Sequence, residues 1–133
     1  MFVKVSSSAR LHLGFYTIRA GNMAYGSIGA AIKKPKVSVL VGKSDKLKIR
    51  NLTQVRVKQD VEDVVKRLNM SGAEVKVLES IPRHVGLGST TQLRLSVAYA
   101  LSKLYSMKSS VRQLAFMLRR GCVSGIGIAT FER

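Results

Sequence analysis

The first part of the chain alternates apolar and polar residues, and this pattern predicts strands. Residues 2–15 place Val3, Val5, Leu11 and Leu13 on alternate positions. The same reasoning predicts strands at residues 25–32, 37–41, 47–52 and 73–78. Pro35 is expected to end the second of these strands, because proline cannot donate to a sheet. A glycine turn over 42–45 predicts that 37–41 and 47–52 form a hairpin.

Apolar residues three and four positions apart predict three helices, at residues 60–69, 89–105 and 110–118. Ser89 and Thr90 have the side chains that cap helix N-termini, and Ser109 or Ser110 is the expected cap of the third helix. The apolar end of the chain, 126–131, predicts the beginning of another strand. Strands with helices packed on one face give an α+β fold, and 133 residues make one domain, 1–133.

Charge is unevenly distributed along the chain. There are 23 Lys and Arg against 7 Asp and Glu, a formal net charge of +16, which attracts polyanions. Residues 1–44 and 80–131 contain no Asp or Glu. A reaction that needs a carboxylate in these segments must therefore take it from elsewhere in the fold.

Membrane insertion and secretion are not expected. No apolar run approaches the roughly 18 residues of a membrane helix, and the charged N-terminal strand does not read as a signal peptide. Cys122 is the single cysteine and cannot form an internal disulfide, so a reducing cytoplasm is the expected compartment.

The segment IPRHVGLGSTTQ, residues 81–92, is the strongest candidate for chemistry. We call residues 81–88 the glycine loop. Glycines allow close approach of the backbone to a ligand, and the first N–H groups of the following helix attract anions. The segment therefore predicts a phosphate site, with an ordinary capped loop as the alternative. It matches neither Gly-x-Gly-x-x-Gly nor the Gly-Lys-Ser/Thr of a P-loop.

This segment resembles the Pro-x-x-x-Gly-Leu-Gly-Ser-Ser-Ala phosphate loop of the GHMP kinase superfamily, which includes galactokinase, homoserine kinase and mevalonate kinase. The order of elements is similar to the N-terminal domain of those enzymes over nearly the whole chain. The resemblance implies a two-layer α/β sandwich like that of ribosomal proteins, with a mixed sheet. It also implies a second half, absent here, which we expect as a C-terminal domain or a separate chain.

Three further motifs resemble the archaeal β-ribofuranosylaminobenzene 5′-phosphate synthases. They are Ser8–Phe15 (SARLHLGF), Tyr25–Gly29 (YGSIG) and the C-terminal segment from Arg120 to Arg133. Enzymes of this class join an aminobenzoate or hydroxybenzoate to phosphoribosyl pyrophosphate and release carbon dioxide and pyrophosphate, in methanopterin-type cofactor synthesis. The resemblance thus implies a transferase with a phosphorylated small-molecule substrate.

The departures from the kinases favour the synthase. Kinases of the superfamily commonly carry an Asp soon after the Ser-Gly of the third motif, but Ser124–Gly127 has no acid. Ionising a bond to pyrophosphate needs cations and N–H donors more than a base. Thr90, Thr91 and Gln92 also replace the small Ser-Ala of the family loop.

The resemblance implies particular roles for residues of the loop and of the two flanking motifs. Gly86, Leu87 and Gly88 would contact the pyrophosphate through their backbone, and Ser89 and Thr90 through their hydroxyls, with Ser89 a candidate Mg²⁺ ligand. The substrate-binding candidates are Arg10, His12, Arg83, His84, Ser124 and Gly125. For each, an exposed strand, a solvated rim or a plain loop remains the alternative. No catalytic residue is identified.

Two other functions remain open. One is a kinase lobe that binds ATP. The other is a basic nucleic-acid-binding module, which is disfavoured because aromatic residues make up only 6% of the chain. We expect the isolated chain to be a weak catalyst or none, and to self-associate through an exposed apolar face.

Overall fold

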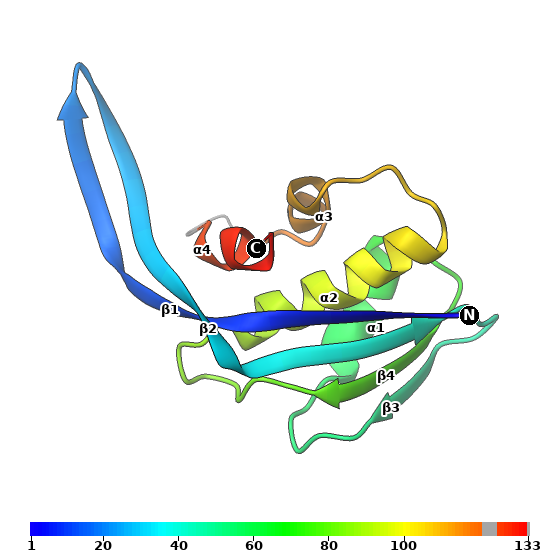
Figure 1. Cartoon of the computed structure of the whole chain (residues 1–133). Coiled ribbons are helices and arrows are strands. Elements are labelled where there is room, and N and C mark those ends of the chain that lie inside the picture. Colours follow the sequence, from blue (N-terminus) through cyan, green and yellow to red (C-terminus); the bar gives the residue numbers. More distant parts are fainter. Residues whose placement is uncertain (121–124, 133) are drawn as a thin grey trace.

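The computed structural model describes residues 1–120 and 125–132, without the side chains of residues 20, 22, 23 and 25. A four-stranded mixed sheet in the order β1-β2-β4-β3 forms one layer, and the helices cover one face of it (Figure 1). The α+β, two-layer prediction is therefore confirmed. The elements are β1 (Phe2–Ala20), β2 (Asn22–Gly42), β3 (Lys48–Asn51), α1 (Lys58–Arg67), β4 (Glu74–Glu79), α2 (Ser89–Leu104), α3 (Val111–Met117) and α4 (Ile126–Phe131).

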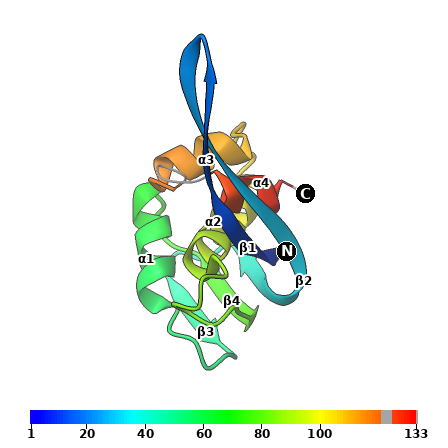
Figure 2. The same ribbon diagram turned by 90° about the vertical axis from the view of Figure 1, so that its left-hand side faces the viewer.

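Strands β1 and β2 form one long antiparallel hairpin whose far half projects beyond the helices (Figures 1 and 2). We call residues 11–30 the arm. Pro35 does not end β2, contrary to expectation. The pairing jumps from Ser8–Lys36 to Ala9–Ile32, which leaves Pro35 in a bulge. A proline is accommodated there because its missing N–H is not needed by the ladder.

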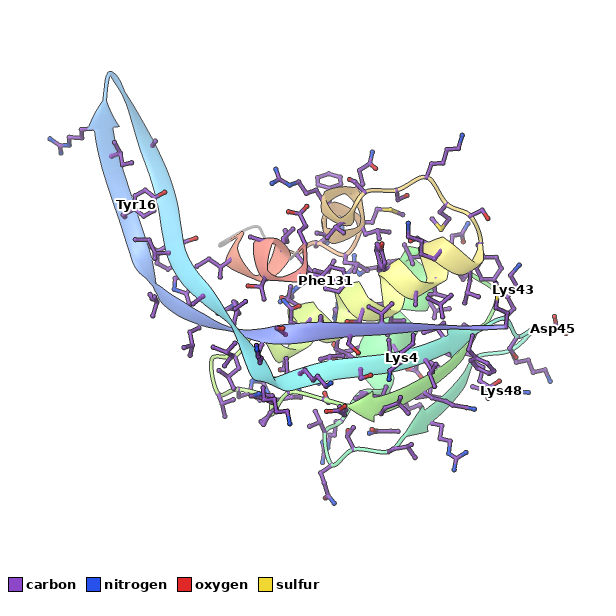
Figure 3. The ribbon with its side chains drawn as sticks, viewed as in Figure 1. Lys4, Tyr16, Lys43, Asp45, Lys48 and Phe131 are labelled. Atoms are coloured by element: carbon purple, nitrogen blue, oxygen red, sulfur yellow. The ribbon has the colours of Figure 1, made fainter. Side chains whose placement is uncertain are left out.

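The arm carries large apolar side chains that the structure leaves in solvent. Leu13 and Phe15 are 66% and 65% exposed, and Ile18 and Ile28 are also mostly exposed. Tyr16 lies on the arm well away from the helices (Figure 3). The alternating pattern predicted the strand correctly. Alternation alone does not show which face of a strand is covered by the rest of the fold and which is left in solvent.

The predicted hairpin between 37–41 and 47–52 is wrong. Strand β4 pairs with β2 on one side and with β3 on the other, and the β3–β4 pair is parallel. Val75 and Val77 are fully buried, so β4 takes the central position where both neighbours cover it. Burial of that apolar strand outweighed the local turn signal of residues 42–45.

Helix α2 is the centre of the core, between the sheet and α1, and most of its side chains are buried. Of the two candidate caps of α3, the structure selects Ser110: Ser110 accepts from the Gln113 N–H, and Gln113 accepts from the Ser110 N–H. No helix within residues 1–120 and 125–132 has the length and apolar character needed to cross a membrane.

The chain end at 126–131 is helix α4 and not the predicted strand. Ile126 of α4 packs so closely on β2 that a Cβ on Gly29 would lie 2.5 Å from its Cγ2. Phe131 meets Tyr99 of α2 edge-on, with ring centroids 5.8 Å apart (Figure 3). A short apolar run fits a strand or a buried helix equally, and here packing on α2 and the hairpin decides for the helix.

Candidate anion site at the start of helix α2

The glycine loop ends at the N-terminus of α2 with an unusual cap. Gly86 and Gly88 have φ angles of 78° and 77°, and Gly88 is the N-cap residue in the left-handed conformation. None of the described side chains caps the helix, so the prediction of Ser89 or Thr90 as caps is wrong. Both lie inside the first turn, which contains no acidic residue. A 16-residue helix thus presents its first N–H groups and its positive dipole end without a side-chain cap.

Arg10 from β1 lies against this loop. Its N–H donates to the Leu87 carbonyl at 3.0 Å, and Nη1 donates to the Gly86 carbonyl at 3.4 Å. The Arg10 side chain also passes so close to Gly88 that a Cβ there would lie 2.9 Å from Arg10 Cγ. The structure therefore brings the predicted residue Arg10 to the predicted loop.

His12 shares a face of the hairpin with Arg10, because residues two apart on a strand point the same way. Arg10 pairs with Ala31 and His12 with Gly29, without a register shift between them. The face of Gly29 is the one that α4 covers. The His12 ring lies 4.6 Å from that of Phe15, and its buried Nε2 has no hydrogen-bond partner among the described residues.

Arg83 and His84 have separate environments. Arg83 Nη1 donates to Asp60 Oδ2 at 2.8 Å and to the Arg56 carbonyl at 3.0 Å, which ties the start of the loop to α1. His84 is exposed with φ of 61° and lies at the rim of an open groove. The groove has a volume of about 1620 Å³ and is lined by β3, residues 54–59 and the Pro82–His84 end of the loop.

The sequence did not indicate that Asp60 lies beside the loop. It is 3% exposed and lines a small recess together with Ser89 and Thr90. Asp60 also accepts from Arg94 Nε at 2.9 Å, and Arg94 reaches Asp63 as well. Because two arginines neutralise this carboxylate, it supplies structure and not a free base.

Asp63 makes the stability of this network depend on pH. A hydrogen bond from the Arg67 side chain, helped by the charges of Arg94 and Arg67, lowers the pKa of Asp63, and these effects outweigh burial, which raises it. A lowered folded-state pKa adds stability above the unfolded value of 3.8, and that stability is lost as pH falls through the folded-state value. When the pH is lowered from about 5 to about 3, we expect the free energy of unfolding to fall less in Asp63→Asn than in the wild type.

Urea denaturation at the two pH values measures this difference. Asp45→Asn is the matched control, since Asp45 is exposed and makes none of the described ion pairs. If Asp63→Asn and Asp45→Asn showed the same pH dependence, the assignment to Asp63 would be wrong.

Gly127 of the C-terminal motif lies beside the first turn of α2 and Arg10. A Cβ on Gly127 would lie 3.0 Å from Thr91 Cγ2 and 3.8 Å from Arg10 Nε. Gly125 is the N-cap residue of α4, so it lies in the same region. Ser124 falls outside the described residues. Arg120 Nε and Nη2 both donate to Thr91 Oγ1, at 3.1 and 2.8 Å. Sequence reasoning missed Arg120 and Thr91 as site residues, although Arg120 opens the third motif.

The described residues do not build a protein-only magnesium cage at Ser89. Mg²⁺ prefers six oxygen ligands with carboxylates among them. Within the described ranges no three His, Cys, Asp or Glu side chains come together, and Asp60 is engaged by Arg83 and Arg94. The Mg²⁺ expectation stays a prediction.

Curated relatives match nearly the whole length of this chain. It is 28% identical over 132 residues to the β-ribofuranosylphenol 5′-phosphate synthase of Archaeoglobus fulgidus, covering 98% of this chain and 42% of that protein. The protein of the same name from Methanothermobacter thermautotrophicus is 30% identical over 141 residues, covering 96% of this chain and 43% of that protein. The chain therefore spans less than half the length of these relatives.

Solved structures of other proteins have a similar fold. Mevalonate kinase of Methanococcus jannaschii matches with a TM-score of 0.62 at 13% identity, over 89% of this chain and 45% of that one. Mevalonate pyrophosphate decarboxylase of Streptococcus pyogenes matches with a TM-score of 0.66 at 12% identity, over 98% of this chain and 45% of that one. The family model described as the GHMP kinases N terminal domain matches residues 55–131, more than half of the sequence. The chain belongs to the GHMP kinase family and represents its N-terminal domain.

Proposed function

We propose that this chain is the phosphate-binding half of a β-ribofuranosylphenol 5′-phosphate synthase-like enzyme. The observation that carries the proposal is the start of α2, which has no side-chain cap and no acid in its first turn, with Arg10 against the loop. Backbone N–H groups, a positive dipole end and a guanidinium together suit a phosphate ester or pyrophosphate. The names of the curated relatives supply the reaction class.

The proposed substrate is phosphoribosyl pyrophosphate, with a hydroxybenzoate or aminobenzoate as acceptor. The bond from ribose C1 to the pyrophosphate oxygen breaks, and the electron pair leaves with pyrophosphate. The ring carbon that bears the carboxylate bonds to C1, and the carboxylate departs as carbon dioxide, restoring the aromatic ring. The relatives are named for a phenol product, which corresponds to the hydroxybenzoate. In this reaction the chain's role is to bind and neutralise the departing pyrophosphate.

The acid distribution supports a synthase over the kinase alternative. The sequence has no Asp or Glu from residue 80 to 131, and Asp60, which lines the recess at Ser89 and Thr90, is held by Arg83 and Arg94. A kinase gains from a base near its acceptor hydroxyl, whereas loss of pyrophosphate gains from positive charge.

We further propose that a second half completes the site, either as a continuation of the chain or as a separate polypeptide. The relatives are more than twice as long, and the exposed apolar side chains of the arm offer a surface to cover. A chain of net charge +16 favours an acidic partner over a second copy of itself. Self-association and low activity of the isolated chain stay predictions.

Calorimetry with phosphoribosyl pyrophosphate and with ATP tests the proposed substrate. We expect phosphoribosyl pyrophosphate to bind at least about tenfold more tightly, because the loop faces cations and not a catalytic base. A preference for ATP would favour the kinase lobe. Titration with RNA at two salt concentrations addresses the net charge of +16: affinity that is high and falls steeply with salt would favour the nucleic-acid module.

A further inference from the structure

The face of the sheet that points away from the helices carries a row of cations. Ser7 of β1 contacts Ser96 of α2 on the covered face, so the even-numbered neighbours of Ser7 along β1 point to the open face. The strand register aligns one residue of each strand on this open face, in the order Lys4, Leu40, Lys76 and Arg50. The row therefore places basic side chains on three of the four strands.

An aromatic ring lies in the adjacent row of the open face. This row consists of Phe2, Gly42, Glu74 and Lys48. Phe2 is 44% exposed, and its ring lies against Gly42, where a Cβ would be 2.7 Å from Phe2 Cε1. Lys76 Nζ lies 4.8 Å from the centroid of the same ring. We call the ring and its surrounding cations the sheet patch, which consists of Phe2, Lys4, Lys48, Arg50 and Lys76.

The cations of the sheet patch are largely not neutralised. Lys4, Lys48 and Arg50 are exposed and take part in none of the ion pairs that the structure describes. Lys76 has a carboxylate partner, Glu74, at 3.8 Å. Four cations against one carboxylate in these two rows leave a positive surface that attracts a polyanion.

An aromatic ring among cations favours single-stranded RNA over an acidic protein as the polyanion. Unpaired bases stack on aromatic rings while the phosphates pair with the surrounding cations. A base can displace the Lys76 ammonium from the ring, because stacking contributes more than a cation–π contact at an exposed site. Ser6, one row further, is exposed and donates to Ser38 Oγ, so its own oxygen can accept from a ribose 2′-hydroxyl.

We infer that the sheet patch binds single-stranded RNA, with a base on Phe2 and phosphates on the surrounding cations. The patch is separate from the proposed pyrophosphate site, because β4 begins at Glu74 beside Phe2 and the glycine loop follows the other end of β4. RNA binding at this face therefore does not depend on the proposed function. The low aromatic content of the chain argues against a dedicated nucleic-acid-binding module, but one exposed ring on a basic face is enough for a short RNA segment.

Fluorescence anisotropy with a labelled oligouridine of about 12 nucleotides tests the role of the ring. Phe2→Leu keeps an apolar side chain and removes the ring, so we expect it to weaken binding about fivefold or more. Phe116→Leu is the matched control and should leave the affinity unchanged, since Phe116 is 84% exposed but belongs to α3. No loss for Phe2→Leu, equal losses for the two variants, or a wild-type chain that binds no oligouridine overturns the inference.

The salt dependence of the same titration tests the cations. The four cations of the patch give an expected slope of log affinity against log salt concentration of about −3, and Lys48→Gln should make it shallower by about 0.7. Lys66→Gln removes the same charge from an exposed position on α1 and should not change the slope. Equal slopes for the two variants, or a wild-type slope several times steeper, would place the RNA over the basic surface in general and overturn the inference.

Competition distinguishes this surface from the proposed pyrophosphate site. Saturating pyrophosphate at constant ionic strength should leave oligouridine binding unchanged, and displacement of the RNA would place it on the glycine loop and overturn the inference. Oligodeoxyuridine should bind more weakly than oligouridine, because it lacks the 2′-hydroxyl. Equal or tighter binding of the DNA overturns the assignment to RNA. If the chain binds oligouridine through the patch but does not bind pyrophosphate, only the proposed function fails.

Discussion

Gly88→Ala is expected to remove most pyrophosphate binding and to destabilise the fold by about 1–2 kcal/mol. Gly88 has a φ of 77°, a conformation that L-residues adopt at a cost. A Cβ at this position would also lie 2.9 Å from Arg10 Cγ and 3.1 Å from Arg10 Nε. Arg10 must therefore move or the loop must open, and either change disrupts the contact between the guanidinium and the α2 N-terminus.

Gly86→Ala is the matched control for the backbone cost. Gly86 has nearly the same φ, 78°, but a Cβ there would meet nothing within 4 Å. We expect a similar loss of stability, about 1 kcal/mol, with a much smaller loss of affinity. The difference in pyrophosphate affinity between the two variants therefore measures how much the position of Arg10 contributes to binding. Urea denaturation and pyrophosphate calorimetry measure both quantities. Equal affinities for the two variants would show that Arg10 against Gly88 does not contribute to the site.

The sequence predicted the loop–helix junction because its signals are local. Two glycines before an apolar 3.6-residue period specify a turn that leads into a helix, and residues 89–104 form that helix. The cap failed as a prediction because Ser89 is a good cap type at the wrong place. Gly88 takes the N-cap position itself, and its left-handed φ places Ser89 inside the helix. Cap preference is a weaker constraint than the backbone geometry of a glycine.

Long-range pairing could not be read from the sequence. The turn residues at 42–45 favoured a local hairpin, yet β3 pairs in parallel with β4, more than twenty residues later. Asp60 likewise reaches the glycine loop only through the packing of α1 on α2. No sequence period or spacing indicates either contact. The β3–β4 pair depends on which strand occupies the centre of the sheet, and the Asp60 contact depends on how α1 packs on α2.

Arg120 is an intermediate case. The third motif identified its neighbourhood, but the hydrogen bonds to Thr91 depend on how the chain after α3 packs against α2. Arg10 was found in advance because it lies in the Ser8–Phe15 motif on which the resemblance rests. The strand period of two places residues 10 and 12 on one face. The sequence did not indicate what packs against that face. The structure shows that the glycine loop and the start of α4 do so.

Asp60→Asn is expected to lower the free energy of unfolding by about 3 kcal/mol, more than the loss expected for Gly88→Ala. Asp60 is almost completely buried and accepts from Arg83 at 2.8 Å and from Arg94 at 2.9 Å. The amide keeps the size of the carboxylate but loses its charge, and it leaves two guanidinium groups without their shared counter-charge. Buried ion pairs add little net stability when intact, but removal of one partner leaves an uncompensated charge.

Glu62→Gln is the matched control, since it removes the same charge from the same helix. Glu62 and Lys58 are 3.8 Å apart, and their side chains are 48% and 81% exposed, so the loss should stay within about 0.5 kcal/mol. Asp60→Asn has a second expected effect: because Arg83 begins the glycine loop, its release should also weaken pyrophosphate binding. Urea denaturation and calorimetry of the two variants measure these effects together. If Asp60→Asn unfolds like Glu62→Gln, then α1 does not hold the loop through this carboxylate, and the stability of the site must come from α2 and the hairpin alone.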